Sequence, residues 1–261
     1  MTILKHELNQ SKISLIIWTS VLSFMLCVCV LIFPEMKAQM QDFDDMFSSM
    51  GSFSDAFGMD TLNFSTMIGY YAIECGNTLG LGGAFFAALC AAGILSKEER
   101  EKTAEFLFTH PVSRVRIITE NLISIICQLV VLNLTVYLTS LASIAIVGEE
   151  IAWKEMALLH IAHFLLQVEI AAISFLFSAL LRRGSAGIGI GVAALMYVLN
   201  LIANITDVLE FLKYITPFGF CEGSDIVADA SLNGIMVVIG MTVTAGAIVL
   251  AYLSYVKKDL R

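Results

Sequence analysis

The chain has 261 residues, of which 58% are hydrophobic and only 15% are charged. A water-soluble domain of this length needs more charged residues to cover its surface, so the composition excludes an ordinary soluble globular protein. The formal net charge of −8 also argues against a nucleic-acid-binding protein, because such proteins present a basic surface.

Six apolar blocks are long enough to cross a membrane, since about 20 helical residues span the hydrocarbon core of a bilayer. They cover residues 14–33, 67–95, 122–147, 157–181, 184–202 and 234–255. We therefore expect an all-α membrane protein with six transmembrane helices in the lipid bilayer, organised as a single membrane domain over residues 1–261. An even number of spans places both termini on the same side.

Residues 1–13 precede the first block and carry Ile3, Leu4 and Leu8 near one helical face. This pattern predicts a short amphipathic helix at the membrane surface that leads into the first span; a frayed terminus is the alternative. No small-residue cleavage site follows the first block, so we expect a retained span and not a signal peptide.

The distribution of basic residues predicts the orientation. Residues 1–13, the loop 96–121, the pair Arg182–Arg183 and the C-terminal tail together hold 12 of the 15 lysines and arginines. Because excess Lys and Arg marks the cytoplasmic side of a membrane protein, we expect both termini in the cytoplasm.

The second and fifth blocks are rich in small residues. Gly83 with Ala87, and Gly187 with Gly191, are pairs of small residues four positions apart. Such pairs let transmembrane helices approach closely, within one chain or between two chains. These two spans are therefore our expectation for the transport pathway and the subunit interface.

Two carboxylates lie inside apolar blocks, at Glu74 and Glu169. An ionised carboxylate is costly in hydrocarbon unless it is hydrated or paired. We expect each to face a water-filled cavity, a partner helix or the other carboxylate. They are our candidates for residues that line a pathway for a cationic or amphipathic cargo; the alternative is a role in hydrogen bonding between helices.

Metal binding could be proposed only for His160 and His163, which lie one helical turn apart with Gln167 on the same face. Two histidines without a carboxylate on that face make a poor site, so we expect no bound metal and favour a structural role. The sequence also lacks a G-x-x-x-x-G-K-[ST] phosphate-binding loop and the G-x-S-x-G and H-E-x-x-H motifs. We therefore expect no catalytic residues in this chain.

The loop between the second and third blocks reads SKEEREKTAEFLFTHPVSRVRIITEN (96–121). Helix propensity is high over 97–108, and Pro111 breaks this helix and suits position N1 of a second helix over 112–120. Residues 106–108 form an apolar Phe-Leu-Phe cluster, and exposed apolar clusters usually mark a contact. The pattern predicts a helix–break–helix elbow that passes movement of a partner to two spans; a solvated loop with orientation charges is the alternative.

This loop resembles the cytoplasmic signature of permease subunits of type 2 ATP-binding-cassette (ABC) exporters. The matching residues are Glu99, Arg100, Glu101, Thr103, Glu105, Leu107, Pro111, Val112, Ser113 and Arg114. In that family the segment is the coupling helix that docks in a groove of the ATPase subunit, which implies the same role here, with Phe106 alongside. Lys102 replaces the usual glycine, and Glu120–Asn121 stand where Gly-Lys is common.

The resemblance implies a permease subunit that works as a dimer, with a second copy or a paralogue, and with two ABC ATPase subunits. ATP and magnesium would then bind to the ATPase subunits and no cofactor to this chain. It also implies a multi-pass protein of a bacterial plasma membrane that exports a drug, an antimicrobial or amphipathic peptide or a lipid-like molecule. The alternative is an ion-gradient-driven secondary transporter or channel that uses Glu169 and the histidines; a membrane enzyme is disfavoured because no catalytic constellation is present.

Overall fold

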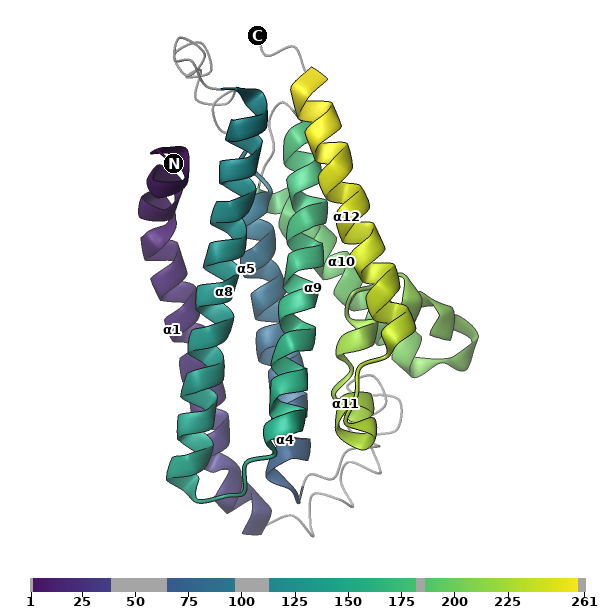
Figure 1. Ribbon diagram of the computed structural model, residues 1–261. Helices are drawn as coiled ribbons and strands as arrows, with labels where there is room; N and C mark the ends of the chain where they lie inside the picture. Colours follow the sequence, from purple (N-terminus) through teal and green to yellow (C-terminus); the bar gives the residue numbers. More distant parts are fainter. Residues whose placement is uncertain (1, 39–64, 97–112, 182–185, 258–261) are drawn as a thin grey trace.

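The computed structural model describes residues 2–38, 65–96, 113–181 and 186–257, and within these ranges the chain is helical with no β-strand (Figure 1). Six of the described helices are long and apolar enough to cross a membrane, which confirms the predicted all-α membrane fold. They are α1 (Thr2–Ala38), a composite second span of α4 (Met67–Cys75), η1 (Gly76–Leu81) and α5 (Gly82–Ala91), α8 (Arg114–Val147), α9 (Trp153–Leu180), α10 (Ala186–Ile205) and α12 (Gly234–Lys257).

The start of α1 and the end of α12 lie at the same end of the bundle, as an even number of spans requires (Figure 1). Two contacts bring the start of α1, the start of α8 and the end of α12 together there. The Leu4 N–H donates to Glu120, and the Arg114 guanidinium donates to the Val256 carbonyl. We call this the inner end, because the basic residues predict that it faces the cytoplasm, and the opposite one the outer end.

The first span is a single helix that includes the predicted surface segment. Residues 2–13 are helical, as expected, but they continue without a break into the apolar part of α1. Pro34 lies inside the last turns of this helix. Since a proline removes only one backbone donor, the helix continues past it for about one turn.

The second span changes its helical form halfway. Thr66 caps its start by accepting a hydrogen bond from the Gly69 N–H at 3.2 Å. Residues 76–81, GNTLGL, then form the π-helical turn η1 between α4 and α5. Single π-helical turns within α-helices are frequent at functional sites because they alter the hydrogen-bond pattern of the backbone.

The helix of the third span begins at Arg114, which lies before the apolar block 122–147 but after the predicted start at Pro111. Ser113 has an extended backbone, and its hydroxyl accepts a hydrogen bond from the Arg116 N–H at 3.3 Å, so it is the N-cap and Arg114 is the first helical residue. The prediction that Pro111 occupies N1 is therefore wrong. Serine is among the strongest N-cap residues, and its side chain satisfies a backbone donor that proline cannot.

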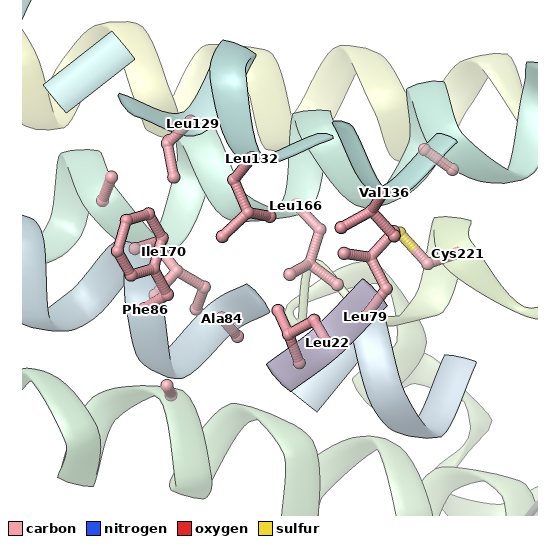
Figure 2. Packing of buried hydrophobic residues seen from close by; sticks show 14 of the residues in the cluster. Leu22, Leu79, Ala84, Phe86, Leu129, Leu132, Val136, Leu166, Ile170 and Cys221 are labelled. Atoms are coloured by element: carbon pink, nitrogen blue, oxygen red, sulfur yellow. The ribbon is translucent and has the colours of Figure 1, made fainter. Parts of the chain in front are cut away.

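The core lies around α9, the most enclosed of the described spans, which contacts α4, α5, α8, α10 and α12. Figure 2 shows buried side chains from several helices meeting there, among them Leu22, Leu79, Leu132 and Leu166. In lipid, such helices associate through close packing and hydrogen bonds more than through exclusion of water. Large apolar residues are exposed on the outward faces of α1, α8 and α12, as contact with hydrocarbon requires.

A folded segment joins α10 to α12 at the outer end. It contains the 3-10 helices η2 (Asp207–Tyr214) and η3 (Gly219–Cys221) and the short helix α11 (Gly223–Asp229). A Cβ on Gly219 would collide with the Lys213 carbonyl, so glycine allows η3 to pack tightly against η2. The helix α11 contacts α4, and both η3 and α11 contact α9, so Glu222 between η3 and α11 is held beside these two spans.

Candidate functional site

The predicted coupling segment lies mostly outside the described residues. Of its predicted contact residues, Ser113 and Arg114 are described. The others, Glu99, Arg100, Glu101, Thr103, Glu105, Phe106, Leu107, Pro111 and Val112, fall outside the described ranges. The assignment of this segment to an ATPase contact stays a prediction.

The base of that segment is tied to two other spans. Glu120 of α8 is buried and accepts hydrogen bonds from the Leu4 N–H of α1 at 2.9 Å and from Arg116 Nε at 2.8 Å. Six residues earlier, Arg114 donates to the Val256 carbonyl of α12 at 3.1 Å. Hydrogen bonds thus connect the first turns of α8 to α1 and α12. Glu120 is one of the two positions where the sequence departs from the Gly-Lys of the resembling permeases.

The histidines of α9 belong to a buried polar network. The Tyr71 hydroxyl donates to Ser140 Oγ at 2.9 Å and lies 2.8 Å from His160 Nε2. His163 Nδ1 lies 2.7 Å from the Leu159 carbonyl oxygen. The two histidines therefore have separate partners, and within the described ranges no group of three or more His, Cys, Asp or Glu side chains could hold a metal ion.

Gln167 links α9 to the π-helical turn of the second span. Its Oε1 accepts a hydrogen bond from Asn133 Nδ2 of α8 at 2.6 Å, and its Nε2 donates to the Leu79 carbonyl of η1 at 3.5 Å. A Cβ on Gly83 would overlap the Gln167 amide. The small residue at 83, predicted to allow close helix packing, therefore makes room for an interhelical polar contact within the chain.

The two carboxylates of the spans face different helices and do not meet. Glu74 accepts a weak hydrogen bond from Cys29 Sγ of α1 at 3.5 Å. Glu169 is only 2% exposed, and its Oε2 has no hydrogen-bond partner among the described residues. It packs against α12, where a Cβ on Gly240 would collide with Oε2. Each thus faces a partner helix, one of the three predicted surroundings, and the pathway role of either stays a prediction.

Two cavities border the second span, an inner one mainly between it and α1 and an outer one between it and the fifth span. The inner cavity has a volume of about 320 Å³, and the residues that line it include Gln10, Cys90, Gln128 and Ala186. The outer cavity, of about 50 Å³, is lined mainly by α4, η1, α10 and the segment after η3. Neither Glu74 nor Glu169 is among the lining residues of these two cavities.

The outer cavity contains the polar residues that sequence reasoning missed. Glu222 lines it and accepts hydrogen bonds from Asn200 Nδ2 at 3.3 Å and from Asn204 Nδ2 at 3.2 Å. Burial raises the pKa of the Glu222 carboxyl, while the two asparagine hydrogen bonds lower it. Asn200 and Asn204 lie four residues apart on a helix. This spacing of two amides near the end of an apolar block is the sequence feature that could have indicated a polar site here.

A comparison with protein families matches residues 1–260 to the ABC-2 family transporter proteins. A search of curated proteins found no match. The family match covers nearly the whole chain and agrees with the six membrane-spanning helices and with the resemblance found in the loop after the second span. The chain therefore belongs to the ABC-2 family of transporter proteins and is a membrane-spanning permease subunit.

Proposed function

We propose that this permease exports its cargo with energy from ATP hydrolysed by two separate ABC ATPase subunits, and that it pairs with a second copy or a related permease. The observation that carries the proposal is the family match over residues 1–260, joined to the coupling signature that ends at Ser113–Arg114. The same proposal places the chain, as a multi-pass protein, in the bacterial plasma membrane.

The geometry at the inner end supports a mechanical role for the start of α8. The coupling segment leads directly into Arg114, and Arg114 and Glu120 connect that helix to α12 and α1. A push on the segment by an ATPase subunit would therefore move three spans together. Nucleotide can drive transport only if it changes the relative free energies of two conformations, so this connection must differ between them.

The two cavities support a pathway between the second and fifth spans. The outer cavity is bordered by several residues of both spans, and the inner one by the second span, α1 and Ala186 at the start of the fifth span. Both contain polar as well as apolar side chains. Such mixed surfaces suit an amphipathic cargo, in agreement with a drug, an antimicrobial or amphipathic peptide or a lipid-like molecule. An α9–α12 contact at Glu169 would sit beside this pathway and control how α12 moves.

The first test is purification of the tagged chain in a mild detergent from its native cells, with mass spectrometry of the proteins that accompany it. We expect a stoichiometric protein with a phosphate-binding Walker loop. A chain that purifies alone, under conditions that preserve other ABC complexes, would contradict the proposal and favour an ion-gradient-driven carrier.

Glu169→Gln is expected to change cargo-stimulated ATPase activity several-fold in the reconstituted complex without changing the amount of ATPase bound. The substitution keeps the shape of the side chain and removes a charge that is costly at this depth. Glu150→Gln, an exposed position between α8 and α9, is the matched control. Equal activity in both variants would assign Glu169 to interhelical packing alone.

A further inference from the structure

The outer cavity is lined by hydrogen-bond acceptors from three parts of the chain. Glu222 comes from the segment between η3 and α11, Asn200 from α10 and His163 from α9. Asn200 is only 6% exposed, and its Oδ1 has no hydrogen-bond partner within the described residues. An acceptor left without a donor at a buried position costs free energy, so the site lacks a donor.

His163 adds a second acceptor. Its Nδ1 lies 2.7 Å from the Leu159 carbonyl oxygen, which can only accept, so this nitrogen carries a proton. In a neutral imidazole the other nitrogen, Nε2, is then an acceptor. A Cβ on Gly80 would lie 3.3 Å from Nε2, so any larger residue at this position of η1 would crowd this nitrogen.

The cavity is lined by one acidic side chain, Glu222, and by no lysine or arginine of the described residues. The hydrogen bonds that Glu222 accepts come from the neutral amides of Asn200 and Asn204, which position the carboxylate without neutralising it. In the described ranges no lysine or arginine forms an ion pair with Glu222. Lys213 is near enough to favour the ionised carboxylate and Asp225 opposes it, while burial raises the pKa of Glu222. The complementary ligand is a cation that donates hydrogen bonds.

We propose that this cavity binds a primary ammonium group, whose three N–H groups donate hydrogen bonds to the Glu222 carboxylate, to Asn200 Oδ1 and to His163 Nε2. An ammonium carries one positive charge and has donors but no acceptor. A hard metal cation would prefer oxygen ligands alone, whereas this cavity mixes carboxylate, amide and imidazole. Its volume of about 50 Å³ holds a small head group and excludes a drug-sized molecule.

The ammonium could belong to a free amine, such as part of a cargo, or to an ethanolamine lipid head group. Glu222 is partly exposed, so both sources can reach it. Binding needs only this chain, so the outcome of its test does not depend on the ATPase partner or on export.

The test uses the full chain purified into nanodiscs of phosphatidylcholine, with methylammonium chloride as the probe. Tetramethylammonium chloride and sodium chloride at equal ionic strength are the references. We expect methylammonium to raise the unfolding midpoint, because a ligand that binds the folded state shifts the unfolding equilibrium by the factor 1 + [L]/Kd. Tetramethylammonium has no N–H donor and should leave the midpoint unchanged. Equal effects of methylammonium and tetramethylammonium, or of methylammonium and sodium, would overturn the proposal.

Two carboxylate variants localise the effect. Glu222→Gln is expected to weaken methylammonium binding at least tenfold, whereas Asp225→Asn, which removes an exposed charge from the same segment, should retain it. A response that survives in Glu222→Gln would overturn the assignment to this cavity. If Glu222→Gln fails to fold, Gly80→Ala replaces it, since the added methyl would crowd His163 Nε2 and should also weaken binding.

The two sources of ammonium are separated by adding phosphatidylethanolamine to the nanodiscs. Competition with methylammonium would identify a lipid head group as an occupant. A methylammonium response unchanged by this lipid would assign the cavity to free amines. Both results support an ammonium site in the outer cavity and differ only in the source of the ammonium group.

Discussion

Phe106→Ala is expected to abolish the stimulation of the copurified ATPase by this chain while leaving the chain inserted in the membrane. The Phe-Leu-Phe cluster at residues 106–108 is predicted to seat in a groove of the ATPase subunit. Truncation of a buried aromatic anchor at an interface costs about 2 kcal/mol or more, which is at least about 30-fold in affinity. The measurement is ATPase rate in reconstituted vesicles together with the stoichiometry of the complex.

Trp153→Ala is the matched control, because it removes an exposed aromatic side chain at the start of α9, at the end of the bundle opposite the coupling segment. This variant should keep both the complex and the stimulation. Glu101→Gln, in the acidic part of the coupling signature, should reduce stimulation like Phe106→Ala. If ATPase stimulation survived in both coupling variants, the coupling role of residues 99–114 would be wrong.

The positions of the spans could be predicted because hydrocarbon tolerates few charged residues. The fourth span was predicted at 157–181 and is helical over Trp153–Leu180, and the sixth was predicted at 234–255 and is helical over Gly234–Lys257. The helix ends were predicted less well. Outside the hydrocarbon a helix ends where a capping residue satisfies its backbone groups, and hydropathy does not show that position. The helix α8 begins eight residues before the apolar block 122–147 because Ser113 caps it.

The neighbours of the polar residues could not be predicted in the same way. Hydropathy marks Glu74 and Glu169 as costly, but it carries no information on which helix each one faces. The contact of Glu169 with Gly240 joins residues far apart in sequence. The outer cavity depends on Glu222, which lies in an irregular segment without periodicity, so its approach to Asn200 follows only from the folded path after α10.

Spacing alone also did not predict which small residues of the fifth span make the helix contact. The predicted pair Gly187 and Gly191 is exposed, whereas Gly189 and Ala193, also four residues apart, are buried. A Cβ on Gly189 would lie 2.7 Å from Ala92 Cβ and 2.9 Å from the Ala88 carbonyl oxygen. The intrachain contact between α10 and α5 thus uses the alternate face of the helix. The exposed pair is left for lipid or for a second permease.

Gly189→Ala is therefore expected to destabilise the chain by about 1–3 kcal/mol, the usual cost of overpacking a close contact. The added methyl group meets the backbone of α5, which cannot rotate away as a side chain can. In an isolated helix the same substitution would stabilise by up to about 1 kcal/mol, so a net loss measures the clash with α5. The measurement is the midpoint of heat-induced unfolding of the purified chain in detergent.

Gly191→Ala is the control in the same helix, because a Cβ there has no described atom within 4 Å. It gains helix propensity without a clash, so its midpoint should equal or exceed that of the unmodified chain. Equal midpoints for the two alanine variants would show that α10 does not pack closely on α5. The proposed pathway between the second and fifth spans would then lose its structural basis and would have to be placed elsewhere.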